Sequence, residues 1–329
     1  MAAPSATSGI HHVTAIAGDP QQNVDFYAGV LGLRLVKRTV NFDDPNSYHF
    51  YYADEAGTPG SILTFFPWPH ARKGRAGVGE VAVTSLAIRP ASMSFWLERF
   101  VRHGVQHEAL AKRFGETTIG FRDHDGLQLE LVATASAESR PAWGGGTVPL
   151  EHAIHGVHSV TLWEHSLAAT EQVLTELFDF RRLATEDATT RFVTGDEGAG
   201  AIVDVREVGG FLGPQGGAGT VHHVAFRASD DSAESALRKR VSELGLHATA
   251  VIDREYFRSV YFREPGGVLF EIATDVPGFA VDEPMEKLGE TLRLPEQYES
   301  RRAEIEQRLL PIILPGSVDR SLSGVEVPV

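Results

Sequence analysis

The chain has 329 residues, of which 42% are hydrophobic and 22% are charged, a balance typical of globular proteins with about two domains. Its 30 basic and 44 acidic residues give a formal net charge of -14. It therefore lacks the positive surface with which proteins neutralise the phosphates of nucleic acid or anionic membranes. We expect a small molecule as its partner.

The sequence contains no cysteine, which excludes disulfides, thiolate nucleophiles, zinc-thiolate sites and iron-sulfur clusters. Any metal must be bound by His, Asp, Glu or other oxygen donors. No apolar run approaches the ~18 residues of a membrane-spanning helix, and residues 1–9 lack the positive start and the apolar core of a signal peptide. We expect a cytoplasmic protein that binds neither membrane nor nucleic acid.

One strand-like segment recurs along the chain. GIHHVTAI from Gly9, GVHSVTLW from Gly156 and TVHHVAFR from Thr220 share a small residue, an aliphatic residue, His, then His or Ser, and Val; VAVTSLAI from Val81 is a weaker copy. Alternating apolar residues and β-branched content predict a strand for each copy. Four copies indicate an internal repeat, which decides the fold.

Each copy begins a unit with the predicted order β-α-β-β-β. In the first unit, apolar residues from Val24 to Leu31 recur at helical spacing, and Gly32 is placed to end that helix. The fourth unit follows the same course with the helix SAESALRKRVSEL and the strands HATAVID, RSVYFRE and VLFEIAT. The predicted units span residues 9–69, 80–135, 154–207 and 220–275.

The four units predict an α+β fold of βαβββ modules paired into two domains. We expect an N-terminal domain of modules 1 and 2 (1–140), a Gly/Pro-rich linker (141–153), a C-terminal domain of modules 3 and 4 (154–280) and a C-terminal helical tail (281–329). One helix per unit cannot cover both faces of a sheet. Units should therefore pack sheet to sheet and leave an open-barrel cleft.

Two positions in each unit indicate a metal site. The position after the first His of the repeat holds His12, Ser85, Ser159 and His223, and a position in the closing strand holds Thr64, Glu130, Asp204 and Glu271. If the first and fourth units face each other, they bring together His12, His223 and Glu271, with Thr64 as a poor fourth donor. Two histidines and one carboxylate with open positions are typical of non-heme Fe(II) enzymes that bind substrate and O2, and Mn(II) suits the same ligands.

The repeat also separates neighbouring histidines. His11, His158 and His222 occupy one position in three units, including the third unit, which lacks the ligand position. A structural role is therefore favoured for them. For His12 and His223 the alternative to a metal is a core histidine satisfied by hydrogen bonds.

The acidic residue of the closing strand can be interpreted in more than one way. Glu271 is flanked by apolar residues in VLFEIAT, where an unpaired buried carboxylate is costly and a metal removes the cost. The alternative is a surface-facing Glu on an amphipathic strand. Glu130 in LQLELVA is interpreted as such a surface residue or as a vestigial ligand.

Longer stretches of the chain resemble the vicinal oxygen chelate superfamily, and within it the hydroquinone-type ring-cleaving dioxygenases. The resemblance rests on GIHHVT, DFYAGVLGLRLVKRTVNFDDP, YHFYYADEAGTPGSILTFFP, HHVAFR and PGGVLFEIATD, and it spans nearly the whole chain. It implies the vicinal oxygen chelate fold of paired βαβββ modules around a metal cleft. It also implies Fe(II) or Mn(II) bound by the second His of each HH pair and a later Glu, here His12, His223 and Glu271.

The resemblance further implies functional groups around the metal. Matched by local sequence, they are His11, Thr14, His222, Arg254 in DREYF and Tyr261 in SVYFREPGG. For His11 and His222 this differs from the structural interpretation, although a His beside a ligand can serve both purposes. The alternatives are a solvated strand-edge charge for Arg254 and simple packing for Tyr261.

The implied function is a ring-cleaving dioxygenase with a small aromatic substrate and O2 as partners. A catechol would chelate the metal through two oxygens and a hydroquinone would bind through one, so the substrate stays open, as do the metal and a homo-oligomeric state. Aromatic residues on one alternating face of the cleft strands would suit a flat ring. The candidates are Tyr48, Phe50, Phe65, Phe66 and Trp68.

Other functions fit parts of the same pattern. A glyoxalase-like isomerase or lyase would stabilise an enediolate without O2, but it would favour a second carboxylate or Gln where Thr64 stands. A non-catalytic binding protein of the antibiotic-resistance kind would leave the two histidines and the glutamate unexplained. An O2-independent metalloprotein is compatible with all of these residues.

Overall fold

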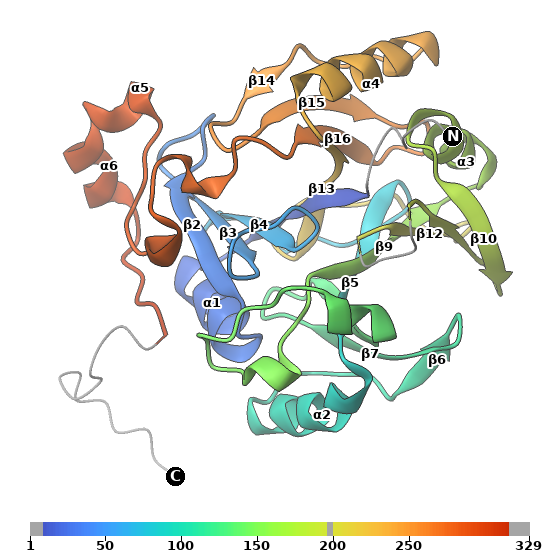
Figure 1. Ribbon diagram of the computed structural model, residues 1–329, viewed down its shortest axis with the longest axis horizontal. Helices are drawn as coiled ribbons and strands as arrows, with labels where there is room; N and C mark the ends of the chain where they lie inside the picture. The colour runs from blue at the N-terminus through green and yellow to red at the C-terminus, as the bar shows by residue number, and fades with distance from the viewer. Residues whose placement is uncertain (1–8, 196–199, 316–329) are drawn as a thin grey trace.

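The computed structural model describes residues 9–195 and 200–315 and contains two sheets of eight strands each (Figure 1). The first unit comprises β1 (Ile10–Ala17), α1 (Pro20–Val24), the π-helical η1 (Asp25–Val30), β2 (Arg34–Val40), β3 (Tyr48–Ala53) and β4 (Ile62–Pro67). The second comprises β5 (Glu80–Ile88), η2 (Pro90–Ser92), α2 (Met93–Arg102), β6 (Ala111–Arg113), β7 (Glu116–Arg122) and β8 (Gln128–Ala133).

The other two units repeat this order after two short helices, η3 (Ala135–Ser139) and η4 (Leu150–His152). The third comprises β9 (Val157–Glu164), α3 (Ala168–Gln172), η5 (Val173–Leu177), β10 (Arg181–Glu186), β11 (Thr189–Val193) and β12 (Ile202–Glu207). The fourth comprises β13 (Thr220–Ala228), α4 (Asp231–Glu243), β14 (Ile252–Asp253), β15 (Arg258–Arg263) and β16 (Leu269–Thr274). The predicted β-α-β-β-β order is thus confirmed in all four units. Gly32 follows the first helix with a φ of 71°, as predicted.

The units pair edge to edge through their first strands, and not face to face as expected. The first sheet has the order β14-β15-β16-β13-β1-β4-β3-β2, and the second has the order β10-β11-β12-β9-β5-β8-β7-β6. β1 pairs antiparallel with β13, and β5 with β9, so that their backbone edges satisfy each other. The first unit therefore joins the fourth, and the second joins the third.

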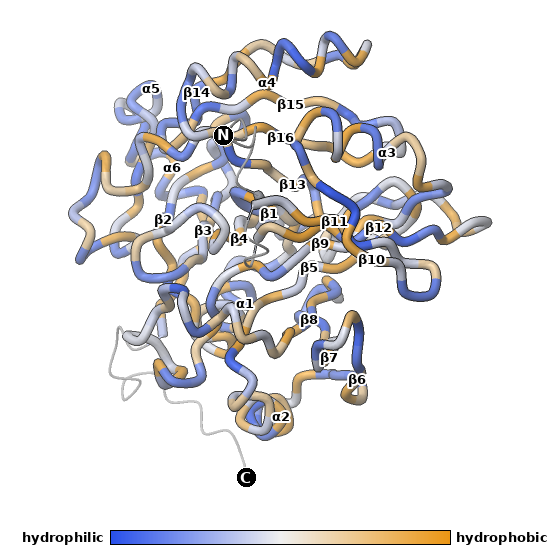
Figure 2. The backbone as a smooth tube through the Cα atoms, turned by 45° about the vertical axis from the view of Figure 1, so that its right-hand side comes forward, coloured by the Kyte–Doolittle hydropathy of each residue, from blue (hydrophilic) through white to orange (hydrophobic). Residues whose placement is uncertain are grey.

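The predicted grouping of modules 1 and 2 (1–140) and of modules 3 and 4 (154–280) does not describe these sheets, because each sheet joins units from both sides of the linker. One hydrophobic core also runs through both sheets, with Val13 and Phe226 in the first and Leu86 and Leu162 in the second. Figure 2 shows the hydrophobic stretches of β5 and β9 in the middle of the molecule. The division of the chain into an N-terminal and a C-terminal domain, joined by residues 141–153, stays a prediction.

Glycine begins two of the repeated strands for a steric reason. Gly9 and Gly156 have φ values of 111° and 86°, in the region where side chains are strained. A Cβ on Gly9 would lie 2.5 Å from the carbonyl oxygen of Gly200, and one on Gly156 would lie 2.9 Å from that of Gly60. The small residue of the repeat therefore lets the two sheets approach at the point where β1 and β9 begin.

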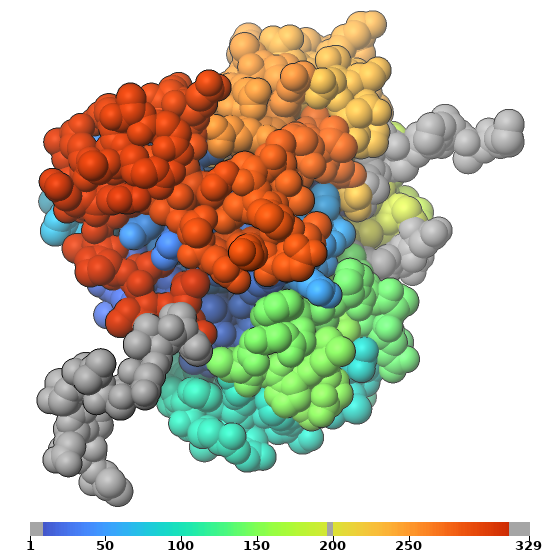
Figure 3. All heavy atoms as spheres, turned by 60° about the vertical axis from the view of Figure 1, so that its left-hand side comes forward, coloured from blue at the N-terminus to red at the C-terminus, as the bar shows by residue number. Residues whose placement is uncertain are grey.

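The last described segment packs against the first unit. It contains η6 (Phe279–Val281), η7 (Met285–Lys287), α5 (Glu296–Glu299) and α6 (Arg302–Arg308), so the predicted helical tail forms several short helices; residues 316–329 lie outside the described part. Buried Lys37 pairs with Asp282 and Glu283. Figure 3 shows these red atoms covering part of the blue first unit. Within residues 9–195 and 200–315, no helix is long and apolar enough to cross a membrane.

The contact between the third and fourth units buries two carboxylates. Glu164 is 1% exposed, and its Oε1 has no hydrogen-bond partner. Glu264 accepts hydrogen bonds from the Thr170 hydroxyl (2.8 Å) and the Val268 amide (2.9 Å). Burial, together with the negative charge of Glu264, raises the pKa of Glu164 from 4.5 to about 8. Glu164 is therefore largely protonated in the folded protein at neutral pH.

We expect Glu164→Gln to stabilise the protein more at about pH 8 than at about pH 5.5. The unfolded wild-type chain releases the Glu164 proton near pH 4.5 and the folded chain keeps it to about pH 8, so the stability of the wild type falls as pH rises through this window. The variant lacks that loss, which amounts to at most about 1.4 kcal/mol per pH unit. Urea unfolding at both pH values measures it, with exposed Glu243→Gln as control. An equal effect of Glu164→Gln at both pH values would contradict the assignment.

Candidate metal centre

Three neighbouring strands place one row of side chains on the same face of the first sheet. His12 of β1 pairs with Ala225 of β13, and Ala225 pairs with Glu271 of β16. His223 lies two residues before Ala225 and therefore points to the same face. Because Ala225 is small, it leaves room above the row for the two imidazoles and the carboxylate to converge.

The side-chain atoms of His12, His223 and Glu271 lie within hydrogen-bonding distance of one another. His223 Nε2 lies 2.8 Å from Glu271 Oε2, His12 Nε2 lies 3.2 Å from the same oxygen, and the two Nε2 atoms are 3.3 Å apart. Glu271 is fully buried, and His12 and His223 are nearly so. The predicted meeting of the three residues is confirmed, and the surface-facing alternative for Glu271 is wrong. Their role as metal ligands stays a prediction.

The donor atoms fit a divalent cation better than they fit one another. Glu271 Oε2 is buried and makes no hydrogen bond, which is costly for an ionised oxygen. Two donors bound at about 2.1 Å and at right angles to one ion lie about 3 Å apart, close to the three separations found here. The site thus has the composition and spacing of two His and one carboxylate on one face of a metal.

The neighbouring histidines contact the other nitrogen of each candidate ligand. His11 Nδ1 lies 2.9 Å from His12 Nδ1, and His222 Nδ1 lies 2.7 Å from His223 Nδ1. With Nε2 directed to the centre, such a contact fixes which nitrogen carries the proton and how the ring is oriented. In the third unit, His158 Nδ1 makes the same contact with the Ser159 hydroxyl (3.0 Å). This common contact supports the structural interpretation of the first His.

Burial sets the charge of these groups. Desolvation lowers the pKa of His11 well below its usual value, that of His222 to about 4, and that of His223. For Glu271, desolvation alone would raise the pKa, but the imidazoles of His12 and His223 outweigh it and hold the pKa well below the usual range. At neutral pH the site therefore presents an ionised carboxylate beside a neutral His223 ring, the forms that bind metal.

A cavity of about 30 Å³ lies over the convergent atoms. Of the five residues that the resemblance placed around the metal, Thr14, Arg254 and Tyr261 line it, whereas His11 and His222 do not. His222 faces a separate cavity of about 220 Å³. Of the five aromatic residues predicted to line the pocket, only Phe66 lines the cavity. The Trp68 ring stacks on the Phe66 ring. The other three, Tyr48, Phe50 and Phe65, belong to the hydrophobic core.

Arg254 and Tyr261 form one wall of this cavity. Nη1 and Nη2 of Arg254 each lie 3.3 Å from Asp43 Oδ2, and its guanidinium lies 5.8 Å from the centre of the Tyr261 ring. The Arg254 side chain is 18% exposed and that of Asp43 is 76% exposed, so this ion pair lies at the edge of the cavity, and a role of Arg254 in the site stays a prediction. Tyr261 is the cross-strand partner of Glu271, and burial raises the pKa of its hydroxyl. The wall therefore offers a cation and a protonated phenol.

The sequence reasoning missed two polar side chains of the same cavity, His49 and Tyr51, which form a hydrogen-bonded chain with Thr64 and Thr14. The Thr64 hydroxyl donates to Thr14 (2.9 Å), His49 Nε2 contacts Thr64 Oγ1 (2.8 Å), and the Tyr51 hydroxyl contacts His49 Nδ1 (2.9 Å). The repeat contained a signal for one of them, because Tyr51 pairs with Thr64 as Tyr261 pairs with Glu271. Nothing in the local sequence distinguished His49.

The second sheet carries the same positions with different chemistry. Ser85 and Ser159 are cross-strand partners, and the Ser85 hydroxyl donates to Glu130 Oε2 (2.8 Å). Glu130 also pairs with Arg113. Glu130 is 7% exposed, so its surface-facing interpretation is wrong.

The acidic residue in the closing strand of the third unit is also neutralised by an arginine. Asp204 is bound by two nitrogens of Arg191, at 2.8 and 2.9 Å. Arginine side chains therefore neutralise both acidic positions that in the first sheet correspond to Thr64 and Glu271.

Residues 9–131 and 156–272 match the Glyoxalase/Bleomycin resistance protein/Dioxygenase superfamily, and the chain belongs to this superfamily. Within it, the chain is 46% identical over 309 residues to MhqO of Bacillus subtilis (strain 168), whose name describes a candidate ring-cleaving dioxygenase; 93% of this chain and 96% of MhqO are covered. It is 32% identical to the chlorohydroquinone/hydroquinone 1,2-dioxygenase of Sphingobium indicum, with 93% and 97% covered.

Solved structures agree with this placement. A crystal structure of a candidate dioxygenase from Bacillus subtilis superposes with a TM-score of 0.90 at 46% identity, covering 94% of this chain and 98% of that chain. Glyoxalase I from Zea mays superposes with a TM-score of 0.59 at 14% identity, covering 81% and 92%, and shows the shared fold alone.

We expect Glu271→Gln to lower the affinity for Fe(II) or Mn(II) by at least about 100-fold, because the amide removes the negative charge that pairs with the cation. Glu130→Gln is the matched control at the repeat-equivalent position and should change metal affinity by less than about twofold. His223→Ala should behave like Glu271→Gln. Metal content after anaerobic loading and chelator competition measures all three, with circular dichroism to check the fold. Equal metal loss in Glu130→Gln would show that the ligands lie elsewhere.

Proposed function

We propose that the protein is a metal-dependent ring-cleaving dioxygenase that opens a hydroquinone-type aromatic with O2. One observation carries the proposal: His12, His223 and Glu271 converge beside a small cavity of about 30 Å³ whose wall holds Arg254 and Tyr261. The names of the relatives support the reaction class, and the dioxygenase from Sphingobium indicum supports the substrate class.

The three residues would bind Fe(II), with Mn(II) as the alternative, because two imidazoles and one carboxylate suit both ions. A metal ion held by these residues would supply a Lewis acid for a phenolic oxygen and a redox centre between the ring and O2. Ser259 donates a hydrogen bond of 2.5 Å to Glu271 Oε1. This contact leaves Oε2 directed toward the histidines and fixes the carboxylate without a movement on binding.

The wall of the cavity would orient the substrate. The guanidinium of Arg254 is a donor and a cation in the lining of the same cavity, where it can bind a phenolate oxygen. Tyr261 keeps its proton because burial raises its pKa, so its hydroxyl can donate to an oxygen of the substrate. The Thr14 hydroxyl, held by Thr64, completes the polar side of the cavity.

The cavity of about 30 Å³ has room for about one water molecule, so the side chains on its apolar side would have to move apart to admit the ring. Phe66 and Phe257 line the cavity together with the polar groups, and His49 packs 4.3 Å from the centre of the Phe66 ring. A hydroquinone offers one oxygen to the metal and directs the other away, toward a separate partner. The single guanidinium across the cavity suits this arrangement better than a catechol, which places both oxygens at the metal.

We expect the anaerobically purified, iron-loaded protein to consume O2 when hydroquinone is added and to form a ring-opened product. Arg254→Gln should raise KM for hydroquinone about tenfold or more, because it removes the cation that binds the phenolate. An oxygen electrode and absorbance spectroscopy measure both effects. Turnover of a hemithioacetal without O2, and no O2 uptake with hydroquinones or catechols, would contradict the proposal and favour a glyoxalase-like lyase.

A further inference from the structure

The second sheet carries a cavity where the first sheet carries the candidate metal centre. It measures about 350 Å³, and its lining includes Arg113 and Glu130, which belong to the second sheet's counterpart of the metal site. Gly120 is the cross-strand partner of Glu130, as Tyr261 is of Glu271. Part of the space that a tyrosine side chain would fill is taken by Glu108, whose Oε2 would lie 2.9 Å from a Cβ on Gly120. The cavity of the second sheet is nevertheless much larger than the cavity over the candidate metal centre.

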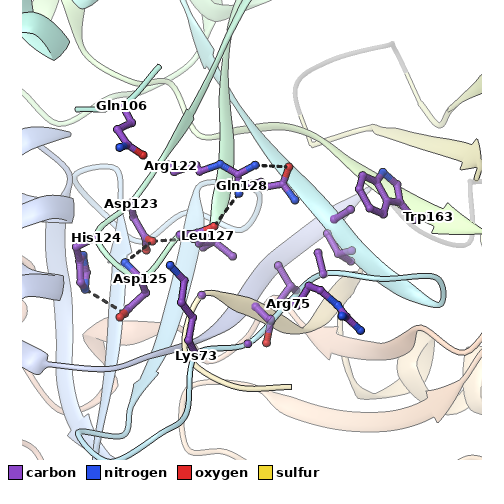
Figure 4. A pocket seen from close by; sticks show the side chains of 18 of the residues that line it. Lys73, Arg75, Gln106, Arg122, Asp123, His124, Asp125, Leu127, Gln128 and Trp163 are labelled. Atoms are coloured by element: carbon purple, nitrogen blue, oxygen red, sulfur yellow. Dashed lines mark hydrogen bonds and ion pairs between the residues drawn. The ribbon is translucent and has the colours of Figure 1, made fainter. Parts of the chain in front are cut away.

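A larger cavity of about 670 Å³ adjoins this cavity of 350 Å³. The two share Gln106, Arg122, Gln128 and Trp163, which Figure 4 shows along one side of the larger cavity. Trp163 is half-buried and packs edge-on against exposed Phe211 at a ring distance of 5.5 Å. The shared wall therefore offers an indole face and a guanidinium to a ligand in the smaller cavity. A volume of 350 Å³ lies within the range of about 300 to 1,000 Å³ of small-molecule sites.

The charges of the smaller cavity favour an anion. Its cationic residues are Arg113, Arg122 and Arg206, and its acidic residues are Glu108 and Glu130. Glu130 already binds Arg113 and the Ser85 hydroxyl. Arg122 makes only long hydrogen bonds, 3.3 Å to Gly126 and 3.4 Å to Gln128.

Two of these guanidiniums are available to a ligand. Among the described residues, neither Arg122 nor Arg206 joins an ion pair. Both are exposed, and the exposed Glu108 carboxylate on the same cavity joins no ion pair among the described residues either, so the groups without an ion-pair partner are two guanidiniums and one carboxylate.

A buried hydroxyl gives an independent sign of a ligand. Thr161 lines the cavity and is 2% exposed, yet its Oγ1 has no hydrogen-bond partner. Thr161 is the repeat equivalent of Thr14, whose hydroxyl receives a hydrogen bond from Thr64. Arg113 Nε is likewise buried and without a partner. Leaving such a group unsatisfied costs about 1 to 3 kcal/mol. Both atoms are covered by neighbouring atoms, so an acceptor bound in the cavity would remove that cost once the covering side chains move aside.

From these features we infer that the cavity on the second sheet binds a small planar carboxylate. Arg122 and Arg206 would bind the carboxylate group, Thr161 would donate its hydroxyl, and Trp163 would pack against the flat part of the ligand. The site lies on a different sheet from His12, His223 and Glu271, and its occupation requires no metal. It is therefore separate from the proposed dioxygenase site and stands or falls independently of that function.

Titration of the metal-loaded full chain with benzoate by calorimetry tests this inference. We expect saturable binding to the wild type, weakened about fivefold or more in Arg206→Gln and in Thr161→Val. Arg102→Gln removes an exposed arginine that does not line the cavity and should change the affinity by less than about twofold. Thr161→Val should not lower the melting temperature, because valine keeps the shape and removes a hydroxyl that has no partner.

The outcomes separate the site from its alternatives. Absence of saturable benzoate binding would overturn the inference, as would equal affinities in wild type, Arg206→Gln and Thr161→Val. Weakening by Glu271→Gln alone would place benzoate at the first sheet and would also overturn it. Loss of binding in Thr161→Val together with an unchanged melting temperature would support it, because a purely structural hydroxyl does not affect affinity without affecting stability.

Discussion

The antiparallel pairing of β1 with β13 is the constraint on which the candidate site depends. These strands lie 203 or more residues apart in the sequence, yet their register brings the Nε2 atoms of His12 and His223 to 3.3 Å and sets Glu271 in the next strand beside them. A shift of one residue would turn the side chains to the opposite face. Gly9 supports this register, because it lets β1 begin against the backbone of the third unit.

The two sheets resolve the same electrostatic problem differently. Each buries an acidic side chain or two in its centre, and a buried carboxylate stays ionised only beside a positive charge or hydrogen-bond donors. In the second sheet, Arg113 and Arg191 supply this charge from the chain itself. In the first sheet, Glu271 Oε2 has no arginine and no hydrogen-bond donor of suitable geometry. A cation bound at this position would be the counterpart of the arginines, as the repeat-equivalent positions of the second sheet indicate.

Much of this was available from the sequence, since the repeat acts as an internal alignment. The comparison of His12 with Ser85, and of Glu271 with Glu130, identified the three convergent residues before their distances were known. The edge-to-edge pairing was not predictable in this way, because the four first strands have similar patterns and backbone edges carry no side-chain signal. His49 was missed for another reason: its partners Thr64 and Tyr51 come from register within the sheet.

The location of bound iron in a crystal tests the account most directly. An anomalous difference map from iron-loaded crystals should show one strong peak per chain between His12 Nε2, His223 Nε2 and Glu271 Oε2, and no peak among Ser85, Ser159, Glu130 and Asp204. A peak at the second sheet, or none at the first sheet in protein that retains iron in solution, would contradict the account.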